Sequence, residues 1–300
     1  MTDLAERVAG APITWGISEV PAWGYQMQPG RVLSEMRSIG LRATELGPEG
    51  FLPLGSERAL LEAHGLSLVA GFVPVVLHDP SSLERELAKV DAAAERISAL
   101  GGSVLVLAAS TGGTGYEEAG RLDASGWTTL GSGILRAAAS AGERGLRVAV
   151  HPHHGTVVER PEDVERLLGV PGVDLCLDTG HVMVGGGDPV ALARSAGPRV
   201  IHVHLKDADA ALAGRVAAGD LGYHAAVRGG LYRPLGEGDV DVLAVVRAVE
   251  ESGGTVWYVL EHDEVLDQEP EPGSGPLLNA RRSLTFLERA WEEVGSTTGR

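Results

Sequence analysis

Short apolar runs alternate with helix-like stretches along the whole chain. Each apolar run is bounded by glycines or polar residues and has the length of a buried strand. The runs cover residues 11–16, 43–47, 67–75, 103–109, 147–153, 173–179, 200–205 and 255–261. Between them apolar residues recur every three or four positions, as in residues 31–39 and 82–100, which is typical of amphipathic helices. This alternation predicts an α/β fold, a single (β/α)8 TIM barrel domain spanning residues 1–300.

Two connections are longer than ordinary loops. Residues 110–125 are rich in glycine and threonine and follow the fourth strand, and residues 207–239 follow the seventh. The connections that leave the carboxyl ends of barrel strands build the face on which active sites lie. We therefore expect both long loops to form lids or walls of a site. The alternative is that they are disordered decoration.

Four of the expected strands end in a cluster of residues that commonly bind metals. The clusters are His151-Pro-His153-His154, Asp178-Thr-Gly-His181, His202-Val-His204-Leu-Lys206-Asp207 and Glu261-His262-Asp263. They hold seven of the ten histidines of the chain. Because the carboxyl ends of barrel strands meet on one face, we expect these side chains to lie close together.

Side chains two residues apart on a strand share a face, and this groups the histidines in pairs. His151 and His153 point to one side of the fifth strand, and His202 and His204 point to one side of the seventh. His202 lies one layer deeper in the barrel. The alternative for His202 is therefore a hydrogen-bonded histidine of the core.

Asp178 and Glu261 interrupt runs that are too apolar to face solvent. A carboxylate inside a barrel is costly to bury unless a cation or hydrogen bonds compensate it. Together with nearby imidazoles such as His204, these carboxylates predict one bound divalent metal ion. A mixed set of nitrogen and oxygen ligands suits manganese, cobalt, zinc or iron better than calcium, which binds oxygen.

Other members of the clusters have structural interpretations beside the functional ones. His154 and His262 should face the helices or the rim of the barrel and support their neighbours. His181 either approaches the site or caps the following helix. Lys206 and Asp207 either reach the site or form an exposed ion pair at the end of the strand.

Composition narrows the class of protein. The hydrophobic fraction of 44 % supports a sizeable core, and no apolar run is as long as a membrane span. The formal charge of −16 argues against a nucleic-acid partner, because phosphate binding needs a basic surface. One cysteine, Cys176, excludes an internal disulfide framework and fits a reducing compartment. The N-terminus shows no secretory signal, so we expect a cytoplasmic protein.

Several of these motifs resemble those of a known family. Asp178-Thr-Gly-His181, His202-Val-His204-Leu-Lys206-Asp207 and Glu261 look like the metal site of the xylose-isomerase-like barrel superfamily, which includes sugar isomerases, sugar epimerases and inosose dehydratase. Other motifs resemble the inosose dehydratase branch of this superfamily. They are Ala11-Pro-Ile-Thr-Trp15-Gly16, Pro21-Ala-Trp-Gly24, Thr44-Glu45-Leu-Gly47 and His151-Pro-His153-His-Gly155-Thr156-Val-Val-Glu159. The resemblance runs over nearly the whole chain.

The resemblance implies metal ligands at Asp178, His204 and Glu261. The fourth ligand in many relatives is a glutamate at the end of strand five, where this chain has His151. We expect His151 to be the fourth ligand, and His153 either replaces it as the ligand or contacts the substrate. The histidine removes one of the two glutamates that exchange a proton in the epimerases, which argues against epimerisation. Of the metals named above, manganese or cobalt is favoured.

The resemblance also implies residues for substrate binding and catalysis. Candidate substrate contacts are Trp15, Glu45, His181, Lys206, Asp207 and Arg233. His153 or Glu261 is expected to act as the base, and Lys206 or His181 as the acid or electrostatic partner.

The implied function is that of a metal-dependent lyase that dehydrates a cyclic keto-polyol, such as 2-keto-myo-inositol, through an enediolate. The first alternative is a metal-dependent isomerase or epimerase of keto-sugars that uses the same enediolate. A metal-dependent phosphate or nucleic-acid enzyme conflicts with the acidic charge, and a non-catalytic carbohydrate-binding barrel is the remaining alternative. The expected partner is a small polyol or sugar, with neither nucleic acid nor membrane, and barrels of this type often form homo-oligomers.

Overall fold

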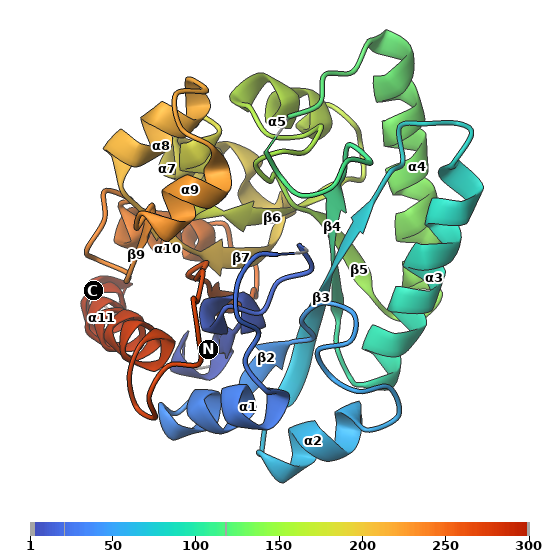
Figure 1. The fold of residues 1–300 in the computed structure, drawn as a ribbon. Helices are drawn as coiled ribbons and strands as arrows, with labels where there is room; N and C mark the ends of the chain where they lie inside the picture. Colours follow the sequence, from blue (N-terminus) through green and yellow to red (C-terminus); the bar gives the residue numbers. More distant parts are fainter. Residues whose placement is uncertain (1–3, 21, 118, 299–300) are drawn as a thin grey trace.

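The strands form a closed barrel in the computed structural model, which describes residues 4–20, 22–117 and 119–298 (Figure 1). Eight strands pair in parallel in the order β1-β10-β7-β6-β5-β4-β3-β2. Their bounds are β1 Val8–Gly10, β2 Ala43–Glu45, β3 Ser67–Val75, β4 Val104–Ala109, β5 Arg147–Val150, β6 Asp174–Asp178, β7 Val200–Leu205 and β10 Tyr258–Leu260. A separate antiparallel pair consists of β8 (Asp207–Ala208) and β9 (Tyr232–Arg233). The expected (β/α)8 barrel is confirmed.

Helices follow the strands and cover the outside of the barrel (Figure 1). They are α1 Pro29–Ser38, α2 Glu57–Ala63, α3 Leu83–Ala99, α4 Ala124–Gly142, α5 Pro161–Leu168, α6 Thr179–Val184, α7 Pro189–Ala196, α8 Ala210–Ala217, α9 Tyr223–Arg228, α10 Val242–Glu251 and α11 Pro276–Thr298, with 3-10 helices at Leu4–Arg7, Pro12–Trp15 and Gly197–Arg199. The helices expected at residues 31–39 and 82–100 are α1 and α3, with ends that differ by one or two residues.

The barrel strands are apolar because both of their faces are covered. β4 reads Val-Leu-Val-Leu-Ala-Ala, and all of its residues are buried. One face of the strands points into the barrel, and the other packs against helices such as α3, whose Leu87, Val90, Ala94 and Ile97 are buried at helical spacing. Parallel strands covered on both faces appear in the sequence as continuous apolar runs. For this reason β3, β4 and β7 lie within one residue of their expected bounds.

The first strand differs from the expectation. The sequence pattern predicts a strand over residues 11–16, whereas β1 ends at Gly10 and a 3-10 helix covers Pro12–Trp15. The Ala11 N–H donates to Leu260 O at 3.2 Å, but Pro12 has no N–H with which to continue the ladder. The expected position was therefore wrong, and residues after Gly10 form a connection at the carboxyl end of the barrel.

The segment of residues 207–239, expected as a long loop, is largely folded. It contains α8, α9 and the β8–β9 pair. The Asp207 carboxylate accepts four backbone N–H groups, from Ala208, Gly236, Gly238 and Val240, at 2.8–3.0 Å, and so ties the end of the segment to its beginning. Residues 111–117 and 119–123, which precede α4, have no regular element.

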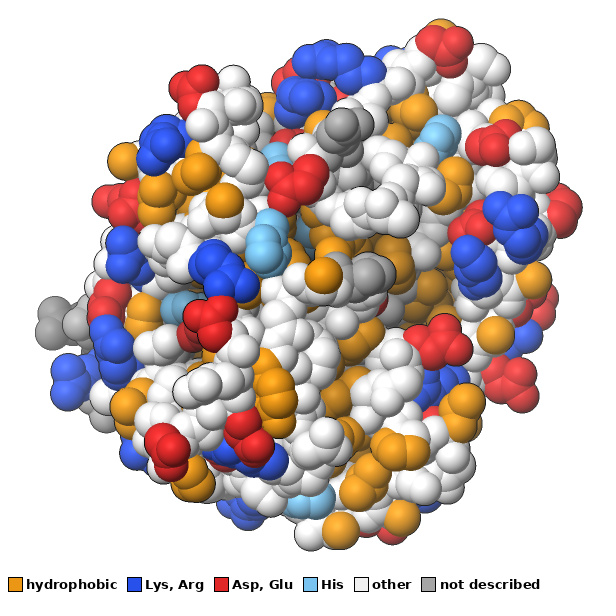
Figure 2. All heavy atoms as spheres, in the orientation of Figure 1, with side chains coloured by type: hydrophobic (Ala, Val, Ile, Leu, Met, Phe, Trp, Pro, Cys, Tyr) orange, Lys and Arg blue, Asp and Glu red, His pale blue; other side chains and the backbone are white. Residues whose placement is uncertain are grey.

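None of the helices in the described part of the chain is long and apolar enough to cross a membrane. On the face drawn in Figure 2, acidic and basic side chains are interspersed rather than gathered in one basic patch.

Candidate active site

Four candidate metal ligands lie at the carboxyl ends of neighbouring strands. Asp178 is the last residue of β6, and His204 is the last but one of β7. His151 directly follows β5 and Glu261 directly follows β10, and the N–H of each still bonds to the neighbouring strand. All four side chains are at most 9 % exposed. The barrel architecture thus brings together residues that are far apart in the sequence.

The ligand atoms of these residues are close enough to share a cation. His204 Nδ1 lies 3.2 Å from His151 Nε2, 3.7 Å from Asp178 Oδ2 and 3.4 Å from Glu261 Oε1. His151 Nε2 lies 3.4 Å from Asp178 Oδ2. Tetrahedral ligands that are about 2.0–2.2 Å from a metal ion lie about 3.3–3.6 Å from one another. The observed spacing therefore fits one coordination sphere.

The chemistry of this cluster also fits a divalent cation. Asp178 Oδ2 is buried and accepts no hydrogen bond from the described residues, while Oδ1 caps α6 by accepting a backbone N–H at 2.7 Å. Glu45, Glu261 and Asp263 are further buried carboxylates, and Lys206 is the lysine among them. An excess of buried negative charge is costly unless a cation compensates it. A bound divalent ion would supply that compensation.

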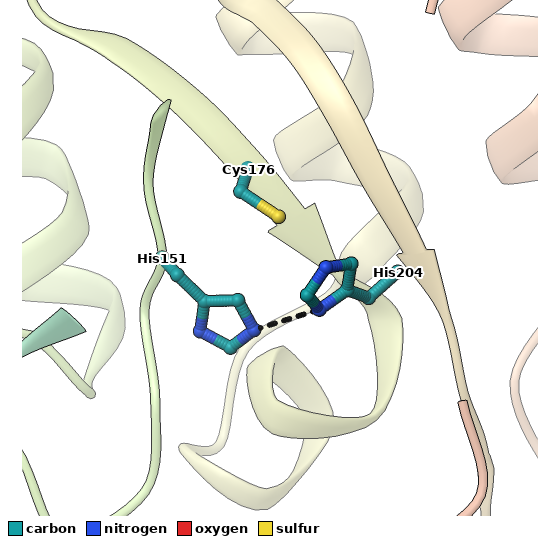
Figure 3. A group of neighbouring side chains, drawn as sticks. All are labelled: His151, Cys176 and His204. Atoms are coloured by element: carbon teal, nitrogen blue, oxygen red, sulfur yellow. Dashed lines mark hydrogen bonds between the residues drawn. The ribbon is translucent and has the colours of Figure 1, made fainter. Parts of the chain in front are cut away.

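Two further groups of possible ligands overlap with this one. They are Glu45, His202 and His204, and His151, Cys176 and His204, with the ligand atoms of each group within 4.8 Å of one another. Figure 3 shows Cys176 pointing from β6 toward the pair of imidazole rings. Burial raises the pKa of Cys176 to about 11, so the thiol is neutral at pH 7. The group with two carboxylates therefore suits a divalent cation better.

Lys206 places a buried ammonium beside the candidate ligands. Its Nζ lies 3.3 Å from Asp178 Oδ2, 2.9 Å from Glu261 Oε2 and 2.8 Å from Asp263 Oδ1. Burial alone lowers the pKa of a lysine, but the three carboxylates raise the pKa of Lys206 well above its ordinary value. The side chain is 2 % exposed, so it is not the exposed ion pair of the alternative interpretation.

Asp263 and Tyr223 face the same site, and no role was predicted for either. Asp263 Oδ2 accepts a hydrogen bond from the Tyr223 hydroxyl at 2.9 Å, and the Tyr223 and Tyr232 hydroxyl oxygens are 3.0 Å apart. Burial raises the pKa of both Asp263 and Tyr223. Tyr223 lies on α9, so only folding of the segment 207–239 brings it to the site. Asp263, which lies two residues after Glu261, could have been identified from the alternation of side chains.

His153 and His181 are a stacked pair with ring centroids 3.8 Å apart. His153 Nδ1 is 2.6 Å from His154 O, which can only accept, so the proton is on Nδ1 and Nε2 is free to accept. The His154 N–H donates to His181 Nδ1 at 3.3 Å, which places the proton of neutral His181 on Nε2. Burial lowers the pKa of both imidazoles well below the ordinary value, so both are neutral at pH 7.

Most of the residues described so far line one cavity of about 80 Å³. Its lining includes Glu45, His151, His153, His204, Lys206 and Glu261, but not His181. The connections after β1 and β4 contribute Glu19 and Tyr116, whose carboxylate and hydroxyl form a 2.5 Å hydrogen bond. The loop of residues 110–125 thus supplies part of the cavity wall.

Besides His181, three expected substrate contacts lie away from this cavity. Trp15 is fully buried in the core, where its Nε1 donates to Glu35 Oε2 at 2.9 Å. The Asp207 carboxylate is occupied by the four backbone N–H groups described above. Arg233 has a side chain that is 43 % exposed and lies 3.3 Å from Asp209 Oδ2. The expectation was wrong for all three residues: Trp15 points into the core, Asp207 into a loop and Arg233 toward solvent.

Two histidines have the supporting positions that the sequence suggests. His154 Nδ1 lies 2.8 Å from Glu159 Oε1, and His262 Nε2 lies 3.4 Å from Glu264 Oε1. His202 is fully buried, and its Nε2 is 2.8 Å from Glu45 Oε1, as in its alternative interpretation as a hydrogen-bonded histidine of the core.

The fold places a buried cluster of candidate metal ligands at the carboxyl end of a parallel (β/α)8 barrel. The chain belongs to the xylose isomerase-like TIM barrel family, whose model matches residues 33–290. It is 32 % identical over 294 residues to the inosose dehydratase of Geobacillus kaustophilus, covering 94 % of each protein. It is 31 % identical over 300 residues to the rhizopine catabolism protein MocC of Rhizobium meliloti, covering 97 % of this chain and 90 % of that protein.

Solved structures show the same barrel at lower identity. An L-ribulose 3-epimerase matches with a TM-score of 0.71 and 15 % identity, covering 97 % of this chain and 96 % of the other. A D-allulose 3-epimerase from Methylomonas sp., solved in complex with D-allulose, matches with a TM-score of 0.69 and 16 % identity over 95 % and 96 % of the two chains. At this level of identity the likeness concerns the fold.

Proposed function

We propose that this protein is a metal-dependent carbon–oxygen lyase that removes water from a cyclic keto-polyol of the inosose type. The observation that carries the proposal is one cavity that contains a metal-ligand cluster, a buried ammonium and a neutral histidine with a free ring nitrogen. The inosose dehydratase of G. kaustophilus supports the choice of reaction, because the similarity extends over 94 % of both chains.

The candidate ligands are His151, Asp178, His204 and Glu261. A divalent ion held there, manganese or cobalt in our proposal, would act as a Lewis acid toward the ketone and acidify the neighbouring C–H bond. The ligand set has the mixed nitrogen and oxygen character that these metals accept.

His153 is the base in this proposal. Its Nδ1 is committed to the His154 carbonyl at 2.6 Å, so the neutral ring offers Nε2 for a proton from the carbon next to the ketone. Glu261, the other candidate base, lies 2.9 Å from Lys206 and 3.4 Å from His204, and these contacts suit a ligand role better.

Lys206 is the acid. Its ammonium lines the cavity and would donate a proton to the β-hydroxyl as the carbon–oxygen bond breaks, so that the hydroxyl leaves as water. The proton taken by His153 then returns to solvent, and Lys206 is reprotonated, so the net change is loss of one water molecule. His181 does not line the cavity and would support His153 by stacking.

The test is to incubate the purified, Mn²⁺-loaded protein with 2-keto-myo-inositol and to follow the ultraviolet absorbance of the dione product. His153→Gln should abolish turnover and retain bound metal. His64→Gln is the matched control, because His64 Nδ1 bonds to Leu60 O on α2, away from the cavity. Deuterium incorporation into a ketose in heavy water without dehydration would instead favour the isomerase or epimerase alternative. The cytoplasmic location, the single domain and a homo-oligomeric state remain predictions.

A further inference from the structure

We infer that Glu45 is a positioning residue for His204, and that it determines which nitrogen of this imidazole faces the metal. The inference rests on the metal centre proposed above. Glu45 was expected near the substrate because of its sequence motif. Its contacts point instead to a role behind the ligand.

The fold directs Glu45 toward the histidines of β7. Glu45 is the last residue of β2, and the register between β2 and β3 shifts between Thr44 and Glu45. Such an irregularity re-aims the side chain that follows it. The Glu45 side chain is 4 % exposed, and its Oε1 lies 3.1 Å from His204 Nε2 and 2.8 Å from His202 Nε2.

These two hydrogen bonds fix the protons of both rings. An ionised carboxylate can only accept, so both Nε2 atoms must carry hydrogen. The unprotonated nitrogen of neutral His204 is then Nδ1, which lies 3.4 Å from Glu261 Oε1 and 3.7 Å from Asp178 Oδ2. The lone pair of His204 therefore points at the candidate metal position.

His202 completes the arrangement from the layer below. The His202 side chain is fully buried, and among the described residues its ring has one hydrogen-bond partner, the same Glu45 oxygen that receives His204. His202 therefore holds the carboxylate in place while Glu45 holds the ligand. Carboxylates behind a metal-bound histidine fix its tautomer and orientation, and their loss typically weakens metal binding about 10–100-fold.

The experiment measures Mn²⁺ affinity by titration calorimetry in the absence of substrate. We expect Glu45→Gln to bind Mn²⁺ about 10–100-fold more weakly than wild type. Glu45→Asp, which keeps the charge but is shorter by one methylene, should show an intermediate loss. Glu57→Gln is the control: Glu57 is also a buried carboxylate, but it pairs with Arg96 at 3.0 Å on the outside of the barrel. Its Mn²⁺ affinity should remain within about threefold of wild type.

A second readout reports the tautomer directly. In ¹⁵N-histidine spectra of the protein loaded with diamagnetic Zn²⁺, the His204 ring should bind the ion through Nδ1 and carry its proton on Nε2, and Glu45→Gln should shift that population. Circular dichroism identifies any variant that has not folded, and Glu45→Asp then carries the test.

Three results would overturn the inference. One is a folded Glu45→Gln protein with wild-type Mn²⁺ affinity and a raised KM, which would make Glu45 a substrate contact. Another is an equal loss of affinity in Glu57→Gln, which would indicate a general loss of stability. The last is wild-type protein that binds no divalent ion, which removes the metal centre itself. Failure of the dehydratase assay with normal Mn²⁺ binding would affect only the proposed reaction.

Discussion

Replacing Lys206 with methionine removes a buried positive charge and keeps most of the side-chain volume. The Lys206 ammonium is within 3.3 Å of oxygens of Asp178, Glu261 and Asp263. In metal-free Lys206→Met protein these three carboxylates would lie together without a compensating ammonium. The variant therefore tests whether the Lys206 ammonium compensates the charge of these three carboxylates, as the short distances imply.

The expected loss is large, and the chain offers an internal comparison. Removing one partner of a buried ion pair costs about 3–5 kcal/mol, whereas an exposed pair contributes about 0–1 kcal/mol. The second lysine of the chain, Lys89, lies 2.8 Å from Glu86, but its side chain is 56 % exposed. Lys206→Met should therefore lower the free energy of unfolding by about 3–5 kcal/mol, and Lys89→Met by less than about 1 kcal/mol.

The assay is urea unfolding with chelator and again with Mn²⁺. An ion that binds only the folded state adds about 2.7 kcal/mol at 100 times its Kd. Because Lys206→Met removes a positive charge beside the ligand oxygens, we expect it to bind Mn²⁺ at least as tightly as wild type and to recover stability on adding the ion. Turnover should be lost, because the acid is missing. A metal-free variant as stable as wild type, or tenfold weaker Mn²⁺ binding, would refute this reasoning.

Three other predictions address the ligands, the thiol and an ion pair outside the site. Asp178→Asn and Glu261→Gln should abolish turnover and lower the metal content found by elemental analysis, and wild-type turnover in either variant after chelation would contradict the ligand set. Cys176→Ala should retain wild-type Mn²⁺ affinity, and Co²⁺-loaded wild type should lack a sulfur-to-cobalt absorption band; a strong band would make Cys176 a ligand. Burial raises the pKa of Glu57, but hydrogen bonds from backbone N–H groups and the Arg96 guanidinium lower it more, so the pKa lies below 4.5. The ionised Glu57 carboxylate therefore stabilises the folded protein above this pH, and this contribution is lost as the pH falls below it. The difference in unfolding free energy between wild type and Glu57→Gln should therefore shrink as the pH falls from 6 toward 3, and a constant difference would contradict the sign.

The barrel was predictable because its strands are buried on both faces. The runs at residues 67–75 and 200–205 have the same bounds in the structure. A parallel strand that is covered on both faces is a continuous apolar run, so the run begins and ends where the strand does. Glycines that close helices were equally informative. Gly101 and Gly145 follow α3 and α4 with φ of 91° and 76°, a conformation that glycine adopts without strain.

The errors arose where local chemistry overrides hydrophobic pattern. Pro12 ends the β1 ladder inside a run that looks like a strand. Residues 207–239 were expected as one long loop, whereas glycines after α8 separate short helices within this segment. Asp207 follows Lys206 directly, yet adjacent positions point to opposite sides, so one reaches the cavity and the other binds backbone. The alternation of side chains could separate Lys206 from Asp207, but the backbone N–H groups that Asp207 binds belong to a segment whose fold the sequence did not predict.

The balance of charge links the unusual ligand at strand five to the proposed base. Four buried carboxylates surround the site, and Lys206 with a divalent ion would contribute three positive charges, which leaves the cluster near −1. A glutamate at the position of His151 would make this −2 and raise the cost of burial. The imidazole avoids that charge but provides no carboxylate base on this side of the cavity. His153 Nε2 is then the nearby group with a free lone pair, because its other nitrogen is held by a carbonyl. The histidine ligand and the histidine base are therefore two consequences of the same limit on buried negative charge.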